Sequence, residues 1–247
     1  MKVRIKFSKE GIMKFIGHLD MMRYFQKAFR RSGIDIAYSK GFSPHQLISF
    51  AAPLGVGLTS RGEYMDIFVH STKDSKTMVE LLNKEMSEGV RVLSWHHIKD
   101  ETKNSNAMSI IAAADYEVSF RDSSVFDVTM QEKFLEFLQQ EHILVRKKTK
   151  KSEKEVDIRP LIFEANVCDG KIFMKLSTGS TDNLKPEFVI GTFMNTLGQS
   201  FNPAMELLIC RLEMYAKNED GQLVSLDMLG EEILCEVVRQ EEGQEPL

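Results

Sequence analysis

The sequence predicts an α+β fold in which two tandem ferredoxin-like (βαββαβ) halves form one extended, mainly antiparallel sheet with helices on one face. Three observations predict it. Segments with apolar residues at every second position alternate with segments of helical period. In the first half they follow the order strand, helix, strand, strand, helix, strand, and strands bracket two helices again in the second half. With 43% apolar residues in 247, the chain can bury a substantial core.

The order of elements divides the chain into four parts. Residues 1–98 form the first half and residues 99–113 a polar linker. Residues 114–216 form the second half, and residues 217–247 form an acidic C-terminal segment that we expect to be solvated.

Each element of the first half has a local sequence signal. Val3, Ile5 and Phe7 alternate with cations, which indicates a half-buried strand whose outer side is basic. From His18 the apolar period becomes helical, and Gly33 stands where a helix would end. The remaining expected elements are strands over 34–38, 63–70 and 90–95 and a helix over 78–86; residues 46–52 are expected to form a further strand or to continue the strand over 34–38.

The second half has equally local signals. The Asp169-Gly170 pair predicts a tight turn between two strands, and Pro186 marks the first turn of a helix. Asp157 and Arg159 are two apart on an extended segment, so we expect their side chains to share a face and pair. The other expected elements are strands over 116–120, 142–146, 163–167, 171–176 and 207–215 and a helix over 130–138. The charge run over 146–155 is expected to be a solvated hairpin tip, and a phosphate-contacting arm is the alternative.

Composition argues against several classes of protein. No apolar run approaches the roughly 20 residues that a membrane-spanning helix needs. The three cysteines, Cys168, Cys210 and Cys235, are scattered and have no CxxC spacing, which argues against a zinc site or an iron–sulfur cluster. We therefore expect a cytoplasmic chain with reduced, buried thiols, no cofactor and no membrane contact.

Charge is divided unevenly along the chain, although the net charge is only −4. Residues 1–61 carry eleven Lys and Arg against three Asp and Glu, whereas residues 219–247 carry nine acidic residues against one Arg. The basic first part indicates an anionic partner such as nucleic acid.

The first expected helix carries much of this positive charge on one face. Arg23, Lys27, Arg30 and Arg31 fall at i, i+4, i+7 and i+8, and Asp20 is the one acid that can offset them. Like charges at this spacing repel by roughly a few tenths of a kcal/mol per pair. This favours an anionic ligand, RNA, as compensation, and an ordinary solvated helix face is the alternative.

The stretch 38–66 is dense in glycine, proline and polar residues between two apolar runs, which is unusual for a simple connection. Within it Phe42 and Tyr64 stand among Lys40 and Arg61. Aromatic rings beside cations suit base stacking next to phosphate contacts. Packing of the aromatic residues in the core is the alternative.

His18 and His45 are the candidate catalytic residues. A pair of histidines near Lys40 suits metal-independent acid–base cleavage of RNA, because imidazole titrates near neutral pH. Structural hydrogen bonding is the alternative role for both. No HxH or HxxxH spacing joins them to Asp20 or Asp66, so no metal site is expected.

Four motifs, in order along the chain, resemble one known family. They are FSKEGIMKFIGHLDMMR at 7–23, AYSKGFSPHQLISFAAPL at 37–54, GEYMDI at 62–67 and EVDIRPLI at 155–162. They resemble the radical SAM-linked protein family, and the resemblance covers roughly residues 1–215. Gln46 departs from that pattern, where a proline or small residue is expected. The motifs contain the expected pair Asp157 and Arg159, and they add Ser43, Pro44 and Glu63 to the residues already singled out.

The resemblance implies a role but not a reaction. Members of that family occur beside, or fused to, a radical SAM protein that often has a cobalamin-binding domain. The chain lacks cluster cysteines, so the resemblance implies the accessory partner. Family members lie near genes for ribosomal proteins and a ribonuclease, which implies work on RNA or a ribosomal component. We expect an RNA-binding or substrate-presenting accessory protein. A metal-independent endoribonuclease using His18 and His45, or a protein-binding adaptor without nucleic acid, are the alternatives.

Overall fold

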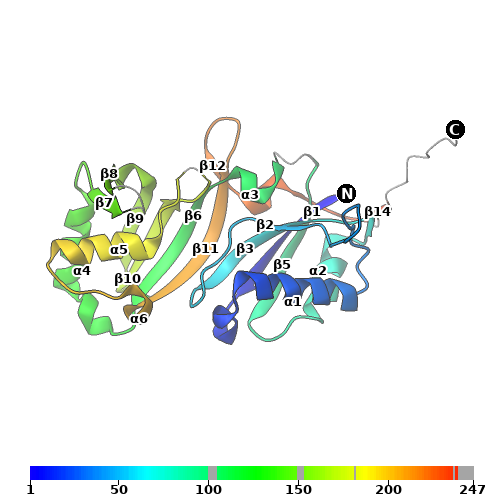
Figure 1. The fold of residues 1–247 in the computed structure, drawn as a ribbon, viewed down its shortest axis with the longest axis horizontal. Coiled ribbons are helices and arrows are strands. Elements are labelled where there is room, and N and C mark those ends of the chain that lie inside the picture. The colour runs from blue at the N-terminus through cyan, green and yellow to red at the C-terminus, as the bar shows by residue number, and fades with distance from the viewer. Residues whose placement is uncertain (100–104, 149–152, 181, 236, 239–247) are drawn as a thin grey trace.

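The computed structural model of the chain has a mixed α+β architecture, in which helices pack against one large sheet (Figure 1). It describes residues 1–99, 105–148, 153–180, 182–235 and 237–238. Among the described strands of the large sheet, every pairing but that of β3 with β11 is antiparallel. The α+β class and the mainly antiparallel sheet are therefore confirmed. No helix in these ranges is long and apolar enough to cross a membrane.

The first half of the chain forms one end of this sheet. Its elements are β1 (Lys2–Lys9), α1 (His18–Arg31), β2 (Ile48–Phe50), β3 (Thr59–Phe68), α2 (Ser75–Asn83) and β5 (Val90–His97). The strands pair in the order β5-β1-β3-β2, each antiparallel to its neighbour. Helix α1 begins at His18 as predicted, and the chain turns after it at Gly33, whose φ of 68° is readily adopted by glycine alone.

The second half forms the other end. Its main elements are β6 (Ile111–Phe120), α4 (Val128–Leu138), β9 (Ile162–Cys168), β10 (Lys171–Ser177), α5 (Pro186–Thr196) and β11 (Leu207–Lys217). They pair in the order β11-β6-β10-β9. The predicted tight turn joins β9 to β10, with left-handed φ angles of 50° at Asp169 and 71° at Gly170. A separate charged hairpin consists of β7 (Leu144–Lys148) and β8 (Glu153–Asp157), and residues 149–152 of its expected tip lie outside the described residues.

The two halves meet at a short parallel pairing in the middle of the sheet. Ser60 of β3 lies opposite Arg211 of β11. The strands approach so closely here that a Cβ atom on Gly62 would lie 2.5 Å from the backbone oxygen of Leu212. This position therefore requires glycine.

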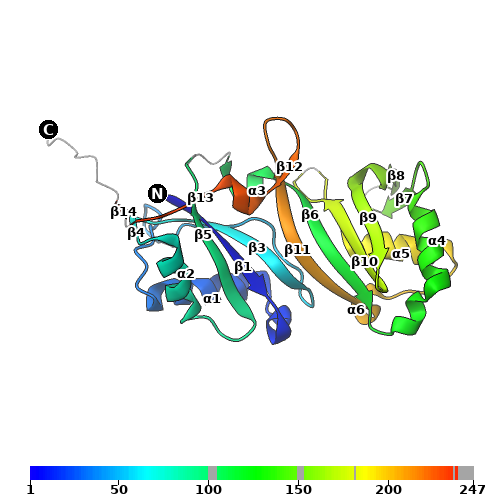
Figure 2. The same ribbon diagram turned by 180° about the vertical axis from the view of Figure 1, so that it is seen from behind.

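Each half has its own apolar core. Helices α1 and α2 cover β1, β3 and β5, whereas α4 and α5 cover β6, β10 and β11. In the first core the rings of Phe7 and Phe25 are 4.8 Å apart between centroids, and in the second those of Phe134 and Phe193 are 5.1 Å apart. Burying each such ring stabilises the fold by roughly 1.5–3 kcal/mol. Helices α1 and α5 lie in front of the sheet in Figure 1 and behind it in Figure 2, so they share one face.

The second side of β1 is not the basic, solvent-facing surface that the alternating pattern predicts. Lys2 and Arg4 are buried, and Arg4 pairs with Asp66 of β3 at 2.7 Å (Nε–Oδ1) and 3.0 Å (Nη2–Oδ2). Lys6 Nζ lies 2.7 Å from Glu213 Oε2 of β11. A buried cation needs a partner, and these acids supply it. Alternation identifies the two faces of a strand, but it does not say what covers each face.

Part of the chain after residue 216 covers this polar face, while Glu219, Asp220, Glu231 and Glu232 stay exposed; residues 236 and 239–247 of the expected acidic segment lie outside the described residues. It contains β12 (Leu223–Ser225), η5 (Leu226–Leu229), β13 (Glu231–Glu232) and β14 (Val237–Val238), the last paired with β4 (Ser71–Thr72). Leu226 is buried and its backbone oxygen accepts a hydrogen bond from Arg4 Nη1 at 3.3 Å. Ile233 enters the first core. These two apolar residues anchor a segment that is rich in acidic residues.

Other departures from the sequence prediction are local. Ile36 and Tyr38 form isolated bridges rather than a strand. The segment 99–113, expected to be a linker, contains α3 (Ala107–Ile110) and the start of β6. The remaining short elements are η1 (Gly11–Phe15), η3 (Ser123–Phe126), η4 (Arg159–Leu161) and α6 (Pro203–Glu206).

The cysteines are less buried than expected. Cys168 and Cys235 are exposed, and Cys210 is half-buried. Burial raises the pKa of the Cys210 thiol. The wide spacing of the cysteines along the sequence indicates that they do not share a site, but it does not indicate how deeply each side chain is buried.

Candidate functional site

The basic surface is a set of exposed side chains from α1 and the loop that follows it: Arg23, Lys27, Arg30, Lys40 and Phe42. The helix cations lie opposite the face of α1 that enters the core. Arg23 Nη1 is 3.1 Å from Asp20 Oδ1, but both side chains are about two-thirds exposed, and such pairs contribute about 0–1 kcal/mol. Lys27 and Arg30 have no acidic partner within 4 Å among the described residues.

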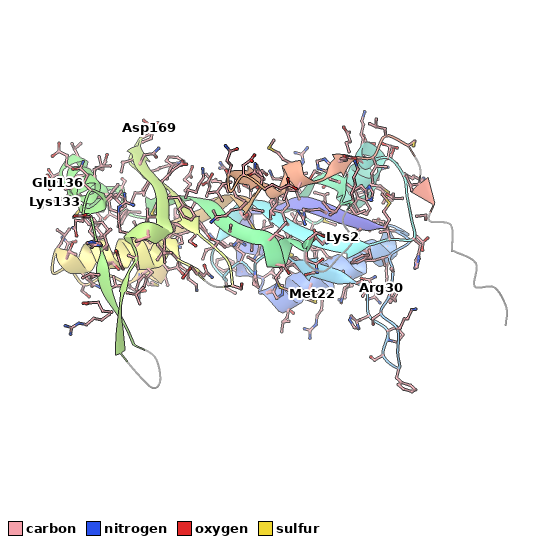
Figure 3. All side chains as sticks on the ribbon, turned by 90° about the horizontal axis from the view of Figure 1, so that it is seen from above. Lys2, Met22, Arg30, Lys133, Glu136 and Asp169 are labelled. Atoms are coloured by element: carbon pink, nitrogen blue, oxygen red, sulfur yellow. The ribbon has the colours of Figure 1, made fainter. Side chains whose placement is uncertain are left out.

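The loop of the basic surface is held against α1. Tyr38 and Gln46 form an isolated antiparallel bridge at its base. Gln46 Nε2 donates to the backbone oxygen of Gln26 at 3.4 Å, and Arg30 Nε donates to the same oxygen at 3.2 Å. The loop therefore starts beside Arg30 and projects away from the sheet there (Figure 3). In this loop Phe42 is fully exposed, as a base-stacking ring would be.

The two candidate catalytic histidines lie apart. His18 opens α1 and packs edge-on against Phe50, with ring centroids 5.1 Å apart. His45 Nδ1 is 2.8 Å from Ser39 Oγ, in the loop that is tied to Gln26. Gln26 lies about 12 Å along α1 from His18 at 1.5 Å per residue. An acid and a base acting on one phosphate must both reach it, so this separation gives the paired cleavage reaction no support.

Tyr64 and Arg61 lie away from the basic surface, although the sequence suggested that they belong to it. Tyr64 is buried and donates to Glu213 Oε1 at 2.5 Å. Burial, and then the Glu213 carboxylate, raise the pKa of its phenol. Arg61 is exposed and lies 3.6 Å from Glu10. Among the described residues, no hydrogen bond or ion pair joins either side chain to α1. Tyr64 is thus unable to stack on a base.

A second set of residues, Arg211, Glu63 and Lys9, lies where the two halves meet; we call it the floor of the cleft, and its member Arg211 lines one of the cavities described below. Arg211 of β11 pairs with Glu63 of β3 at 2.7 Å (Nε–Oε1) and 2.6 Å (Nη2–Oε2), and both side chains are buried. Arg211 Nη2 also donates to the backbone oxygen of Ala52 at 2.9 Å. Buried Lys9 donates to the backbone oxygen of Ile16 at 2.6 Å. These contacts tie strands from both halves to the segments that line the cleft.

The charges on this floor influence one another. Burial lowers the pKa of the Lys9 ammonium, and the Glu63 carboxylate opposes that shift. Burial acts in the same direction on Arg211, but the charge and hydrogen bonds of Glu63 outweigh it, so the pKa of the guanidinium is raised. One carboxylate therefore stabilises two buried cations.

Two cavities flank the loop 53–58, which connects β2 to β3 and lies at the cleft between the two halves. Their volumes are about 400 Å³ and 250 Å³, and Leu58 and Glu187 line both. Glu187 lies in the first turn of α5, and its Oε1 is 3.8 Å from Lys185 Nζ. Its Oε2 is shielded from solvent and has no hydrogen-bond partner among the described residues. The Glu187 side chain as a whole is 31% exposed, which leaves the carboxylate accessible from the cavities that it lines.

The motif residues of the second half have structural contacts. Asp157 accepts hydrogen bonds from His142 Nδ1 at 2.8 Å and from the backbone nitrogens of Ile143 and Arg159 at 2.9 and 3.0 Å. These bonds, first the one from His142, lower the pKa of Asp157. The Arg159 guanidinium instead donates to the backbone oxygen of Ile162 at 3.0 Å. The pair expected from sequence thus meets through a backbone amide rather than through opposite charges. The motif residues exposed on the loop of the basic surface are Ser43 and Pro44.

Sequence reasoning missed three residues of the cleft, Lys9, Glu187 and Arg211. A signal exists for Arg211, because it is the one cation inside an apolar strand and a buried charge needs a partner. Glu187 resembles any acid in a first helical turn, where the helix dipole favours it, so no local signal distinguishes it. In the described part of the chain, no group of three His, Cys, Asp or Glu residues could hold a metal ion.

Among curated proteins, none matches this chain. A family model described as "Uncharacterized protein conserved in bacteria (DUF2344)" matches residues 2–186. The matched range contains the whole basic surface together with Lys9 and Glu63, and it ends one residue before Glu187. Because the match spans well over half of the 247 residues, the chain belongs to this DUF2344 family of bacterial proteins.

Proposed function

We propose that this chain binds RNA through the basic surface and acts as an RNA-binding or substrate-presenting accessory protein. The observation that carries the proposal is the position of Lys27 and Arg30, exposed and without an acidic partner among the described residues, on the helix that holds the base of the loop in which Phe42 is exposed. Such cations attract phosphates, and a ring in water offers a stacking platform that tolerates any base.

The exposure of Phe42 is unfavourable for the isolated chain. A phenylalanine ring left in water lacks the roughly 1.5–3 kcal/mol of stabilisation that its burial would give. Gly41 in the same loop has a φ of 119°, a conformation that suits only glycine, and Pro44 restricts the backbone further. The loop is thus preorganised to present the ring, which favours a binding role over a chance exposure.

We also propose that each end of the sheet is a ferredoxin-like half. In both β5-β1-β3-β2 and β11-β6-β10-β9, the main strands follow the order fourth, first, third, second within their half. The helices follow the first and third of these strands along the chain. These two arrangements support a repeated βαββαβ unit, in which the second copy carries the β7–β8 hairpin as an insertion.

A radical SAM enzyme is the partner that we propose, on the basis of the sequence motifs at 7–23, 37–54, 62–67 and 155–162. In that role the chain holds RNA while the partner supplies the chemistry. Affinity purification of a tagged chain after nuclease treatment tests this directly. Recovery of a radical SAM protein supports the partnership, and its absence both with and without nuclease argues against it.

The RNA-binding proposal predicts salt-dependent affinity, which fluorescence anisotropy with labelled single-stranded RNA measures. Each phosphate contact contributes about 0.7 to the slope of log K against log salt for single strands. The variant Arg23→Ala/Lys27→Ala/Arg30→Ala should therefore bind more weakly and lose about 2 from that slope. Phe42→Ala should weaken binding by about 1–3 kcal/mol, the usual stacking contribution, and leave the slope unchanged.

A matched control removes the same charge from exposed positions away from α1. Arg91→Ala/Lys133→Ala/Lys217→Ala does this, and Lys133 lies at the opposite end of the molecule from Arg30 (Figure 3). The control should bind RNA like the wild type. Equal weakening by both triple variants would show that net charge alone is responsible. No binding by the wild type at low salt would refute the proposed function.

A further inference from the structure

The larger cavity of the cleft offers a binding site that the basic surface does not use. Its volume of about 400 Å³ lies within the roughly 300–1,000 Å³ typical of small-ligand sites. Much of its wall is apolar and includes Leu58 and the more exposed Phe15 and Val56, whose exposed fractions are 64% and 61%. Apolar side chains left open to solvent around a cavity suit a flat, apolar ligand.

Three charged side chains line the same cavity: Lys14, Arg121 and Glu187. Lys14 Nζ lies 5.2 Å from the centre of the Phe15 ring, and Arg121 is exposed. Neither cation has an acidic partner within 4 Å in the described part of the chain. Glu187 Oε2 lacks a hydrogen-bond donor, as noted above. The cavity thus combines an unsatisfied acceptor with two cations that are free to bind an anion.

We infer that this cavity binds a guanine nucleotide of the RNA. A carboxylate is best matched by two neighbouring N–H donors, as in its pairing with arginine. Guanine presents two such donors, N1–H and N2–H, on its Watson–Crick edge, whereas adenine and cytosine present one donor beside an acceptor and uracil presents one donor between two acceptors. Proteins read unpaired RNA bases by this edge and by stacking.

In this site the Glu187 carboxylate accepts both guanine N–H groups, and the base lies against Phe15 and Leu58. Rotation about the terminal bond of a glutamate is nearly free, so Oε2 can turn from its shielded position into the cavity. Lys14 and Arg121 bind the attached phosphate. No other standard base presents two adjacent N–H donors to the carboxylate.

The inference rests on the proposed RNA-binding function and names the base that the protein selects. Helix α1 connects the two regions, because Arg30 lies near its end and η1, which contains Phe15, precedes its start. From Arg30 to His18 the helix rises about 18 Å. An RNA strand that follows the exposed face of α1 from the loop of the basic surface therefore arrives at the cleft.

Anisotropy measurements on the chain of residues 1–247 test the inference with oligouridine and with copies in which one uridine is replaced by guanosine, adenosine, cytidine or inosine. The guanosine oligonucleotide should bind about tenfold more tightly than those with the other three standard bases, the usual effect of one well-formed bidentate contact. Inosine, which lacks the N2 amino group, should give an intermediate affinity. GMP should compete better than AMP, CMP or UMP.

Two variants locate the selectivity. Glu187→Gln places an amide donor beside a guanine donor, so it should abolish the preference for guanosine over the other three standard bases. Ala204→Trp fills the cavity from an exposed wall position and should have the same effect. Glu136→Gln, which removes the same charge from exposed helix α4 at one end of the molecule (Figure 3), should keep the preference. Circular dichroism confirms that each variant is folded.

The outcomes separate the two claims. Equal affinities for all the oligonucleotides, or a guanine preference that persists in both Glu187→Gln and Ala204→Trp, would overturn the guanine site while RNA binding stands. GMP binding that depends on Glu187, in a chain that does not bind RNA, would support the site and refute the proposed function. Binding of neither GMP nor RNA would refute both.

Discussion

The ion pair between Arg211 and Glu63 provides a quantitative test of how the two halves are held together. Both side chains are buried, so breaking the pair from one side should cost about 3–5 kcal/mol of unfolding free energy. Glu63→Gln removes the carboxylate that stabilises both Arg211 and Lys9, so it should reach the upper end of this range. Arg211→Met leaves Glu63 with Lys9 as a counter-ion, so its cost should stay near the lower end.

Urea unfolding followed by far-UV circular dichroism measures these costs. The double variant Glu63→Leu/Arg211→Met removes both charges and should be more stable than Glu63→Gln, because apolar replacement of a whole buried pair is often neutral. As a control, Glu85→Gln breaks the more exposed pair with Arg31, at 2.7 Å, and should cost less than about 1 kcal/mol.

Two results would refute this reasoning. One is a cost for Glu63→Gln no larger than that for Glu85→Gln, which would mean that the floor of the cleft is well hydrated. The other is a larger cost for Arg211→Met than for Glu63→Gln, which would mean that Lys9 does not share the carboxylate.

Three further perturbations have expected outcomes. The pKa of the Tyr64 phenol is raised in the folded chain, so this group ionises in the unfolded chain first as the pH rises. Its contribution to the free energy of unfolding is complete below the ordinary pKa of 10.0. Above that pH the contribution falls by up to about 1.4 kcal/mol per pH unit. In urea unfolding at alkaline pH, Tyr64→Phe should reduce this slope, and an unchanged slope would contradict the assignment. Gly62→Ala places a Cβ against the backbone of β11 and should cost about 1–3 kcal/mol in the same assay, whereas Gly191→Ala in α5 has room and should be neutral or stabilising. Exposed Cys168 should react rapidly with a thiol reagent and Cys210 slowly, and equal rates would show that burial does not protect Cys210.

Local sequence signals located the elements whose conformation is determined locally. Helix α1 begins at His18 and α5 at Pro186, because helical period and a proline in the first turn depend only on nearby residues. The burial of Arg4 was not predictable in this way, since its partner Asp66 is 62 residues away and its cover comes from the last part of the chain.

The candidate site likewise contains features that nearby sequence determines and features that contacts between distant residues determine. The helical period of α1 places Arg23, Lys27 and Arg30 on one face, and the structure has that face exposed. Phe42 and Tyr64, by contrast, are both aromatic residues near cations in the sequence. The sheet buries Tyr64 beneath the C-terminal segment and leaves Phe42 in water, and only long-range strand pairing distinguishes them.

The position of β11 affects how the chain assembles during synthesis. Arg211 lies 148 residues after its partner Glu63. At a synthesis rate of about 5–20 residues per second, β11 is therefore made roughly 7–30 s after β3, and until then part of the edge of β3 is unpaired. An unpaired strand edge recruits other chains. Strand β2 covers Met65–Ile67 of that edge early, and the uncovered part contains Arg61 and Gly62, a charged residue and a poor strand former. Strand β2 and these two residues thus limit pairing of the open edge of β3 with other chains until β11 has been synthesised.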